Sequence, residues 1–337
     1  MGSIAGSRFY LAVASVFLFI GLFSLPGAAQ TGPGEVILEK PQPTSELPGP
    51  EAKKEEVPTT CGPLISDTCI PIEEHHASLQ VLWGLSLVRT FADNNWKSVN
   101  AGGNFGTFIM PVKFTFGPTK HLEIYTIAPL IVNYVNNATV PGPGGETSAT
   151  YTGIGDISLF AKYLFIEEGK FAPWMPAVTA VFGTGFPTGH ASHLNPRFLT
   201  VDEIGTGAFT FTTGVNLYKW LKPFLFYSNL WISTPVNIYP TNFSNVRSRE
   251  YVTANLAVEY PFNKKWIGLV EFYSTWTWQP IVSAQGYQSP ATLLGVLPGV
   301  EYFINDKWAL SLGTAVDLAG KSTPLKVTPL FTVYYNF

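Results

Sequence analysis

The sequence predicts an all-β protein: a transmembrane, antiparallel, up-and-down β-barrel of about twelve strands, with an N-terminal signal peptide and a flexible periplasmic arm. Two observations predict this fold class. From residue 77 onward, segments of roughly ten residues alternate between large apolar and small polar side chains, as barrel strands in lipid do. The connections between these segments are alternately short and mostly long, which is the arrangement of bacterial outer-membrane barrels.

The composition agrees with this fold class. Of the 337 residues, only 13% are charged and 15% are aromatic, whereas soluble domains carry roughly 25% charged residues. The mean hydropathy is only +0.17, because every second residue of a barrel strand faces inward. After residue 30 no run of 18 apolar residues occurs, which argues against membrane-spanning helices. The net charge of −3 argues against a nucleic-acid binder.

Residues 1–29 read as a signal peptide. Arg8 supplies the positive charge, Phe9–Phe23 is an almost continuous apolar run, and the small residues Gly27-Ala28-Ala29 suit cleavage after Ala29. The alternative is a retained N-terminal anchor, but the run is short and Pro26 follows it. We therefore expect an exported protein.

Residues 30–76 are predicted to form a Pro-rich periplasmic linker with a small cysteine loop. Residues 31–60 hold six prolines and the charged cluster Glu51–Glu56 and show no periodicity. The linker is either a passive spacer or a contact for a periplasmic partner.

Cys61 and Cys69 are the only cysteines. In an exported protein, two cysteines eight positions apart predict a disulfide. The sharper alternative is a metal site completed by His75 and His76. Zinc ligands usually pair at two to four positions, so this spacing predicts no metal site.

The first predicted strand shows the alternation most clearly. In Ser78–Leu87, every second residue from Leu79 is large and apolar, and the opposite face carries serine, glutamine and glycine, with Leu82 the exception. A soluble sandwich would show similar strands, but the connection lengths favour a barrel occupying residues 77–337. The twelve predicted strands are residues 77–90, 105–116, 122–135, 154–165, 172–184, 206–218, 222–234, 249–260, 266–278, 292–303, 307–318 and 325–337.

Aromatic residues gather at the strand ends. Amphipathic rings prefer the headgroup level of a membrane, so tryptophans in or beside the short turns predict an interfacial girdle on the periplasmic side. These four residues are Trp174, Trp220, Trp266 and Trp308. Three others, Trp231, Trp276 and Trp278, lie near the long loops and are predicted to mark the opposite girdle.

The segment Gly153–Phe165 carries a Gly-x-Gly-Asp sequence followed by Lys162-Tyr163. It resembles an outer-membrane family that is annotated with the meta-pathway of phenol degradation and labelled a transporter. Val181–Gly189 resembles the next strand and loop of that family. The resemblance implies an outer-membrane channel over residues 77–337. The terminal Phe337 also resembles the C-terminal signal that the barrel-assembly machinery reads.

Charged residues inside the predicted strands should point into the lumen, since a base facing lipid at mid-bilayer costs about 2–4 kcal/mol. We expect these residues either to form a charged constriction or to pair across strands and seal a narrow barrel. The pore-lining candidates are Lys113, Asp156, Lys162, Glu259, Glu271, Glu301 and Lys326.

The predicted function is passive uptake of small, apolar or aromatic solutes through the outer membrane of a Gram-negative-type bacterium. The alternative is a non-conducting structural or sensing barrel whose arm contacts a periplasmic partner. No histidine has a serine and an acid at a spacing that suggests a catalytic triad, so we expect no enzyme. The expected partners are outer-membrane lipid and the solute, without nucleic acid, cofactor or metal.

Overall fold

The computed structural model describes residues 60–237, 250–277, 282–283, 286–287 and 290–337. The predicted signal peptide and most of the predicted linker lie outside these residues. Described residues from 60 to 171 and from 175 to 337 belong to one compact unit, which excludes Ala172–Trp174. None of the described residues forms a helix that is long and apolar enough to cross a membrane.

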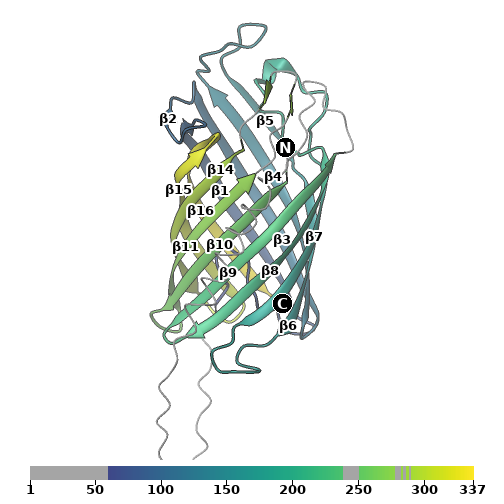
Figure 1. Ribbon diagram of the computed structural model, residues 1–337, viewed down its shortest axis with the longest axis vertical. Helices are drawn as coiled ribbons and strands as arrows, with labels where there is room; N and C mark the ends of the chain where they lie inside the picture. Colours follow the sequence, from purple (N-terminus) through teal and green to yellow (C-terminus); the bar gives the residue numbers. More distant parts are fainter. Residues whose placement is uncertain (1–59, 238–249, 278–281, 284–285, 288–289) are drawn as a thin grey trace, which may run out of the picture. The chain divides into compact units, whose positions relative to one another are not determined.

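Twelve long strands form a closed antiparallel barrel (Figure 1), which confirms the predicted fold class. Each strand pairs with its sequence neighbour, and the last strand pairs with the first to close the barrel. The barrel strands are β1 (Ala77–Ala92), β3 (Asn104–Thr119), β4 (Leu122–Asn136), β6 (Ile157–Ile166), β7 (Ala177–Phe186), β8 (Ala208–Leu221), β9 (Phe224–Asn237), β10 (Tyr251–Pro261), β11 (Trp266–Thr277), β14 (Thr292–Phe303), β15 (Trp308–Lys321) and β16 (Thr323–Asn336).

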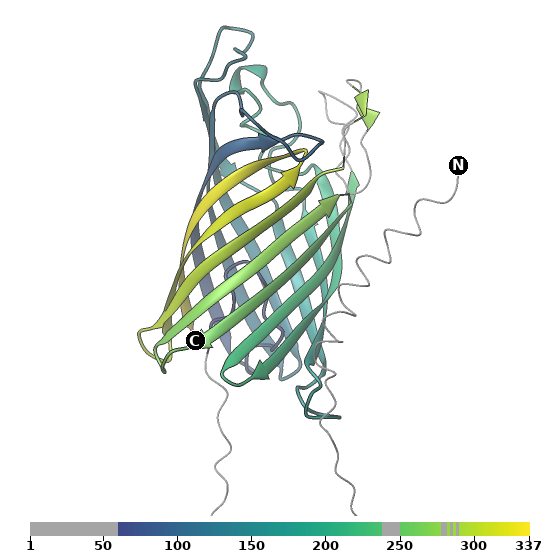
Figure 2. The ribbon, with the colours of Figure 1, turned by 60° about the vertical axis from the view of Figure 1, so that its left-hand side comes forward.

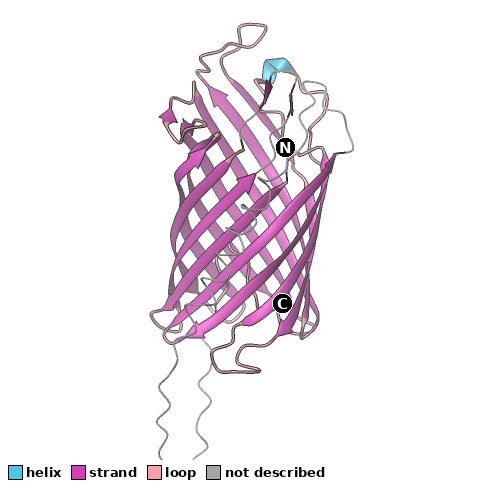
Figure 3. Cartoon of the chain, in the orientation of Figure 1, coloured by secondary structure: helices cyan, strands magenta, loops and turns pink. Residues whose placement is uncertain are grey.

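Short elements supplement the barrel. β2 (Ser98–Val99) pairs with β1, β5 (Ala149–Ile154) pairs with β4, and β12 (Val282–Ser283) pairs with β13 (Gly286–Tyr287) in a separate two-stranded sheet. The described residues contain a single 3-10 turn, η1 (Pro196–Phe198), which is cyan in Figure 3.

The two ends of the barrel differ in their connections. Four turns of two to four residues lie at one end, the short-turn end, where the C-terminus also lies (Figure 2). The fifth connection at this end, residues 167–176, has ten residues, and except for a one-residue turn the connections at the other end have eleven or more. The short-turn end of an outer-membrane barrel faces the periplasm.

The large apolar and small polar residues that alternate in the sequence lie on the outer and inner faces of the barrel wall. Phe182, Phe211 and Leu312 on the outer wall are each about half exposed, whereas Thr179 and Thr332 face inward and are fully buried. An apolar outer wall is what lipid requires of a barrel.

All twelve predicted strands are present, and the differences have local causes. β7 begins at Ala177 rather than 172, because Pro173 and Pro176 supply no N–H to a strand ladder. The predicted loop 319–324 is a single-residue turn at Ser322, which adopts a φ of 50°. The strand predicted to begin at residue 154 is divided, with Gly155-Asp156 between β5 and β6.

Four glycines lie directly opposite an aromatic residue on the neighbouring strand, and the ring occupies the space that a side chain at the glycine position would need. The pairs are Gly183 with Phe160, Gly106 with Tyr134, Gly214 with Trp231, and Gly295 with Tyr273. An aromatic ring that covers a strand glycine helps to fix strand register.

The Gly183 position allows a direct test. A Cβ at Gly183 would overlap the Phe160 ring, whereas a Cβ at Gly185, two residues along the same strand, meets only ordinary contacts. We expect Gly183→Ala to lower the free energy of unfolding by about 1–3 kcal/mol. Gly185→Ala should stay within about 0.5 kcal/mol of the native protein. Urea unfolding in lipid measures both free energies. Equal losses of stability in the two variants would show that the Phe160 ring does not need the space beside Gly183.

Candidate functional site: a segment inside the barrel

Residues 60–76, which we call the plug, run through the lumen at the short-turn end and lead directly into β1 (Figures 1 and 2). Plug atoms form hydrogen bonds or ion pairs with inward-facing side chains from nine of the twelve barrel strands. Those side chains are Lys113, Glu123, Lys162, Thr179, Asn216, Asn229, Glu259, Glu271 and Glu301. The segment expected to belong to a periplasmic linker therefore contacts the inner wall of the barrel.

Glu271 on β11 binds the main chain of the plug. Its two carboxylate oxygens accept hydrogen bonds from the main-chain N–H groups of Leu64, Ile65 and Ser66, at N···O distances of 2.6 to 3.1 Å. Glu271 is fully buried. Charge-assisted bonds to consecutive N–H groups stabilise a carboxylate that has left water.

Asp67 binds the opposite, basic side of the lumen. Its carboxylate lies 3.4 Å from the ammonium groups of both Lys113 and Lys162, and it accepts a hydrogen bond from Asn216 at 2.9 Å. Lys162 also pairs with Glu123 at 2.8 Å. Burial acts to raise the pKa of Asp67, but the two lysines together with the hydrogen bonds from Asn216 and Lys162 hold this pKa below its usual value.

Two asparagines bind the plug next to this ion-pair network. The Asn229 amide accepts from the Asp67 N–H at 2.8 Å and donates to the Asp67 carbonyl at 2.9 Å, as a neighbouring strand would. Asn216 donates to the carbonyl of Thr68 and accepts from Asn229 and from the indole of Trp231. The plug is thus held through its main chain as well as its side chains.

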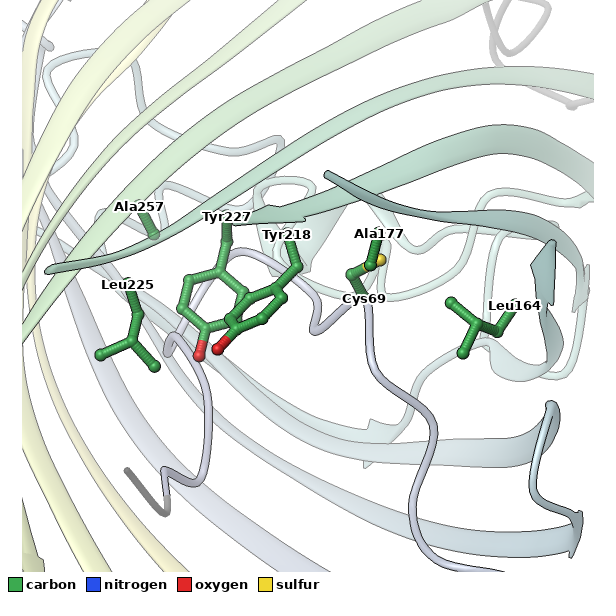
Figure 4. Packing of buried hydrophobic residues seen from close by; sticks show 7 residues of the cluster. All are labelled: Cys69, Leu164, Ala177, Tyr218, Leu225, Tyr227 and Ala257. Atoms are coloured by element: carbon green, nitrogen blue, oxygen red, sulfur yellow. The ribbon is translucent and has the colours of Figure 1, made fainter. Parts of the chain in front are cut away.

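Two apolar contacts anchor the plug. Cys69 is fully buried in a cluster with barrel residues that Figure 4 shows, including Tyr218, Tyr227 and Leu164. Leu64 packs with a second cluster that includes Leu297. These two clusters lie on different sides of the barrel, so the plug crosses the lumen between them.

The predicted disulfide is not formed, because Cys61 and Cys69 are both free thiols. The Cys69 sulfur lies 3.2 Å from the Thr179 hydroxyl on β7, whereas the main chain of Cys61 donates to Glu301 on β14. The spacing in the sequence suggested a small disulfide loop, but the two cysteines form contacts with different barrel strands instead.

Five of the seven predicted pore-lining residues contact the plug: Lys113, Lys162, Glu259, Glu271 and Glu301. The main chain of Lys326 donates to Asp317 on the neighbouring strand, away from the plug. Asn216, Asn229 and Thr179 were not singled out from the sequence. The apolar stretch around Asp67, between Leu64 and Ile72, was the available signal that this segment is covered by other parts of the chain.

Asp156 acts at the other end of the barrel. It accepts hydrogen bonds from the N–H of Gly189 and from the N–H and hydroxyl of Thr206, at 2.6 to 2.9 Å. Gly189 and Gly205 allow the loop backbone to approach this carboxylate closely. The Gly-Asp part of the family-like motif therefore fastens the loop 187–207, and its Lys162 binds the plug.

The tryptophans take different positions. Trp266 and Trp308 are exposed and lie 4.5 Å, between ring centroids, from Tyr302 and Tyr335. Trp174 is also exposed, whereas Trp220 packs against the cluster around Cys69. Trp231 points inward and its indole donates a hydrogen bond to Asn216, so the prediction that it belongs to the girdle near the long loops is wrong. Strand parity, rather than nearness to a loop, decides which way a ring faces.

A family model described as "Putative MetA-pathway of phenol degradation" matches residues 88–328. The chain belongs to this family. The matched residues cover most of the barrel, and the plug precedes them. A search of curated proteins gives no match.

Comparison with solved structures finds similar chains, one of which, with a TM-score above 0.5, shares the fold. The COG4313 outer membrane channel from Pseudomonas putida F1 has a TM-score of 0.60 at 14% identity, with 80% of this chain and 98% of that chain covered. The translocator domain of the autotransporter NalP from Neisseria meningitidis gives 0.46 at 12% identity, covering 79% and 90%. The Ralstonia pickettii toluene transporter TbuX gives 0.39 at 9% identity, covering 79% and 90%.

Lys162 tests the seating of the plug. Lys162→Met leaves the buried carboxylates of Asp67 and Glu123 without this partner, and breaking a buried ion pair costs about 3–5 kcal/mol. Burial raises the pKa of Cys69 to about 12, so its thiol is protected in the seated plug. In a Cys61→Ser background, we expect maleimide labelling of Cys69 in the folded barrel to accelerate by at least about tenfold.

Lys120→Met is the matched control for this experiment. Lys120 also pairs with a carboxylate, Glu167, but both groups are largely exposed in a turn outside the lumen. Its labelling rate should equal that of the Cys61→Ser parent. Equal rates for the Lys162 and Lys120 variants would mean that the ion pairs do not hold the plug.

Proposed function

We propose that this protein is a channel of the bacterial outer membrane that admits small aromatic solutes by passive diffusion. In this proposal the plug occupies the periplasmic part of the lumen and must be displaced for passage. The observation that carries the proposal is a group of aromatic rings on the inner wall, next to the residues that bind the plug.

Three inward-facing rings form this group, which we call the aromatic row. Tyr125 and Phe160 stack with centroids 5.0 Å apart and planes at 14°, and Phe160 lies 6.0 Å from Trp231. Phe160 is on β6 and Trp231 on β9, so two strands separate them. Gly183 and Gly214 on those strands leave the space in which the two rings meet. Stacked rings offer a planar solute further stacking surfaces.

A basic group accompanies the rings. The ammonium of Lys113 lies 4.0 Å from the centroid of Tyr125, and the Lys113 side chain is 22% exposed. An aromatic solute with a hydroxyl or carboxylate group would find both a stacking surface and a hydrogen-bond donor here. This favours solutes of the phenol type over purely aliphatic ones.

The comparisons support the same direction. The family description names phenol degradation, and a channel with the same fold is described as an outer membrane channel. Membership in such a family supports an aromatic solute, and the barrel fold supports the outer membrane as the location.

Planar-bilayer conductance tests the channel. We expect a variant that lacks residues 60–72 to conduct at least several times more than the full-length protein, because the side chains that bind the plug become hydrated lumen walls. Heat-modifiable migration on a gel verifies that both proteins are folded barrels. If the folded deletion variant shows no conductance, the channel proposal fails and the non-conducting barrel replaces it.

Trp231 tests the solute class. In liposomes that contain the plug-deleted protein, Trp231→Ala should reduce phenol uptake about fivefold or more, since stacking on an aromatic ring contributes about 1 kcal/mol. Trp231→Phe should retain most of the uptake. Trp266→Ala, on the outer wall, is the control and should behave as the parent. Equal phenol uptake in all three variants would exclude the aromatic row from solute selection.

A further inference from the structure

Two buried carboxylates lie next to Thr60, the first residue of the plug. Glu259 on β10 and Glu301 on β14 are both fully buried. One oxygen of each lies near the Thr60 hydroxyl, at 2.7 Å for Glu259 and 3.3 Å for Glu301. The Tyr227 hydroxyl also donates to Glu259, and the Cys61 N–H donates to Glu301.

The protons at this point are too few for the acceptors. The Thr60 hydroxyl has one proton, which it can donate to only one of the two carboxylates, and its own oxygen accepts from the Gly62 N–H at 2.9 Å. The second oxygen of Glu259 and the second oxygen of Glu301 have no hydrogen-bond partner among the described residues. Buried carboxylate oxygens without partners are strongly unfavourable.

The described residues supply no base to this pair. The two lysines that face the plug, Lys113 and Lys162, pair with Asp67 and Glu123 instead. The third glutamate of this side, Glu271, is satisfied by main-chain N–H groups. Within the described part of the chain, no basic side chain forms an ion pair with Glu259 or Glu301.

Two hydroxyl groups on the neighbouring strands provide an independent observation. Ser311 lies directly opposite Glu301 in the register of β14 and β15, and Thr332 lies opposite Ser311 on β16. Both side chains are at most 1% exposed; the Thr332 hydroxyl has no hydrogen-bond partner in the described part of the chain, and the Ser311 hydroxyl neighbours only that of Tyr334, without a hydrogen bond of good geometry. Unpartnered oxygens thus extend the acidic pair along the inner wall.

We propose that Glu259 and Glu301 bind a hard divalent cation of the Ca²⁺ class, with Ser311 as a neighbouring hydroxyl ligand. Carboxylates, hydroxyls and water are the ligands that Ca²⁺ takes, in a flexible geometry. No third acidic, histidine or cysteine side chain of the described residues completes a metal cluster here, so hydroxyls and water fill the remaining positions. This donor set does not suit soft transition metals.

The position of the two glutamates explains how a cation would reach them and how its binding would affect the plug. Glu259 and Glu301 each lie two residues before the end of their strand at the short-turn end, near the periplasmic mouth. A cation between them binds the same two carboxylates that contact Thr60 and Cys61 of the plug. It would therefore stabilise the plug in its seated position.

The test uses the full-length protein, purified in detergent, freed of lipopolysaccharide and treated with EGTA. Terbium(III) replaces Ca²⁺ and emits when excited through a nearby tyrosine, and Tyr227 already contacts Glu259. We expect saturable terbium emission that Ca²⁺ displaces, and a rise of several degrees in Tm with about 1 mM Ca²⁺, a concentration typical of weak extracellular sites.

Variants and controls decide the outcome. Glu259→Gln, Glu301→Gln and Ser311→Ala should weaken terbium binding, the two Gln variants by at least tenfold. Asp317→Asn removes a carboxylate that Tyr273 already binds, and it should leave terbium binding unchanged. The proposal is overturned if neither Ca²⁺ nor EGTA changes the Tm of the native protein and if its terbium emission equals that of the two Gln variants. It is equally overturned, in favour of a shared proton, if only acidification stabilises the native protein over the Gln variants.

Discussion

The hydrogen bonds between inward carboxylates and the main chain of the plug are the interaction on which the rest of this structure depends. A coil without secondary structure has N–H groups that need partners, and a buried carboxylate needs donors. Glu271 and the N–H groups of Leu64, Ile65 and Ser66 satisfy each other. Neither the inner wall nor the plug is electrostatically complete alone, so the lumen and the segment inside it form one structural unit.

The distribution of charge around the wall orients the plug. The three glutamates lie on consecutive barrel strands β10, β11 and β14, and the two lysines that reach Asp67 lie on β3 and β6. The acidic arc receives main-chain N–H groups, and the basic arc receives the one carboxylate of the plug that pairs with lysine. A reversed plug would place Asp67 against the glutamates, where like charges repel.

Strand parity made the barrel wall predictable from the sequence, whereas the presence of the plug inside the lumen was not predictable. Alternation located all twelve strands and turned Lys162 and Glu271 inward. The plug has no sequence period, and the side chains that bind it lie between 46 and 241 residues away in the sequence, 207 residues in the case of Leu64 and Glu271. The cysteines misled for a related reason: a disulfide is inferred from local spacing, whereas Cys69 bonds to Thr179, 110 residues later. Side chains whose partners are remote in sequence leave no local pattern.

The nature of these contacts makes the plug displaceable. A hydrogen bond that water can replace contributes only about 0.5–1.5 kcal/mol net, and the carboxylates of a vacated lumen would be hydrated. Lys162 would keep its pair with Glu123 when Asp67 leaves. The apolar anchors behave differently, since burying a leucine contributes about 1.5–3 kcal/mol that water does not restore. Leu64 and Cys69 therefore add to the ion pairs of Asp67 a resistance to displacement that hydration of the lumen does not offset.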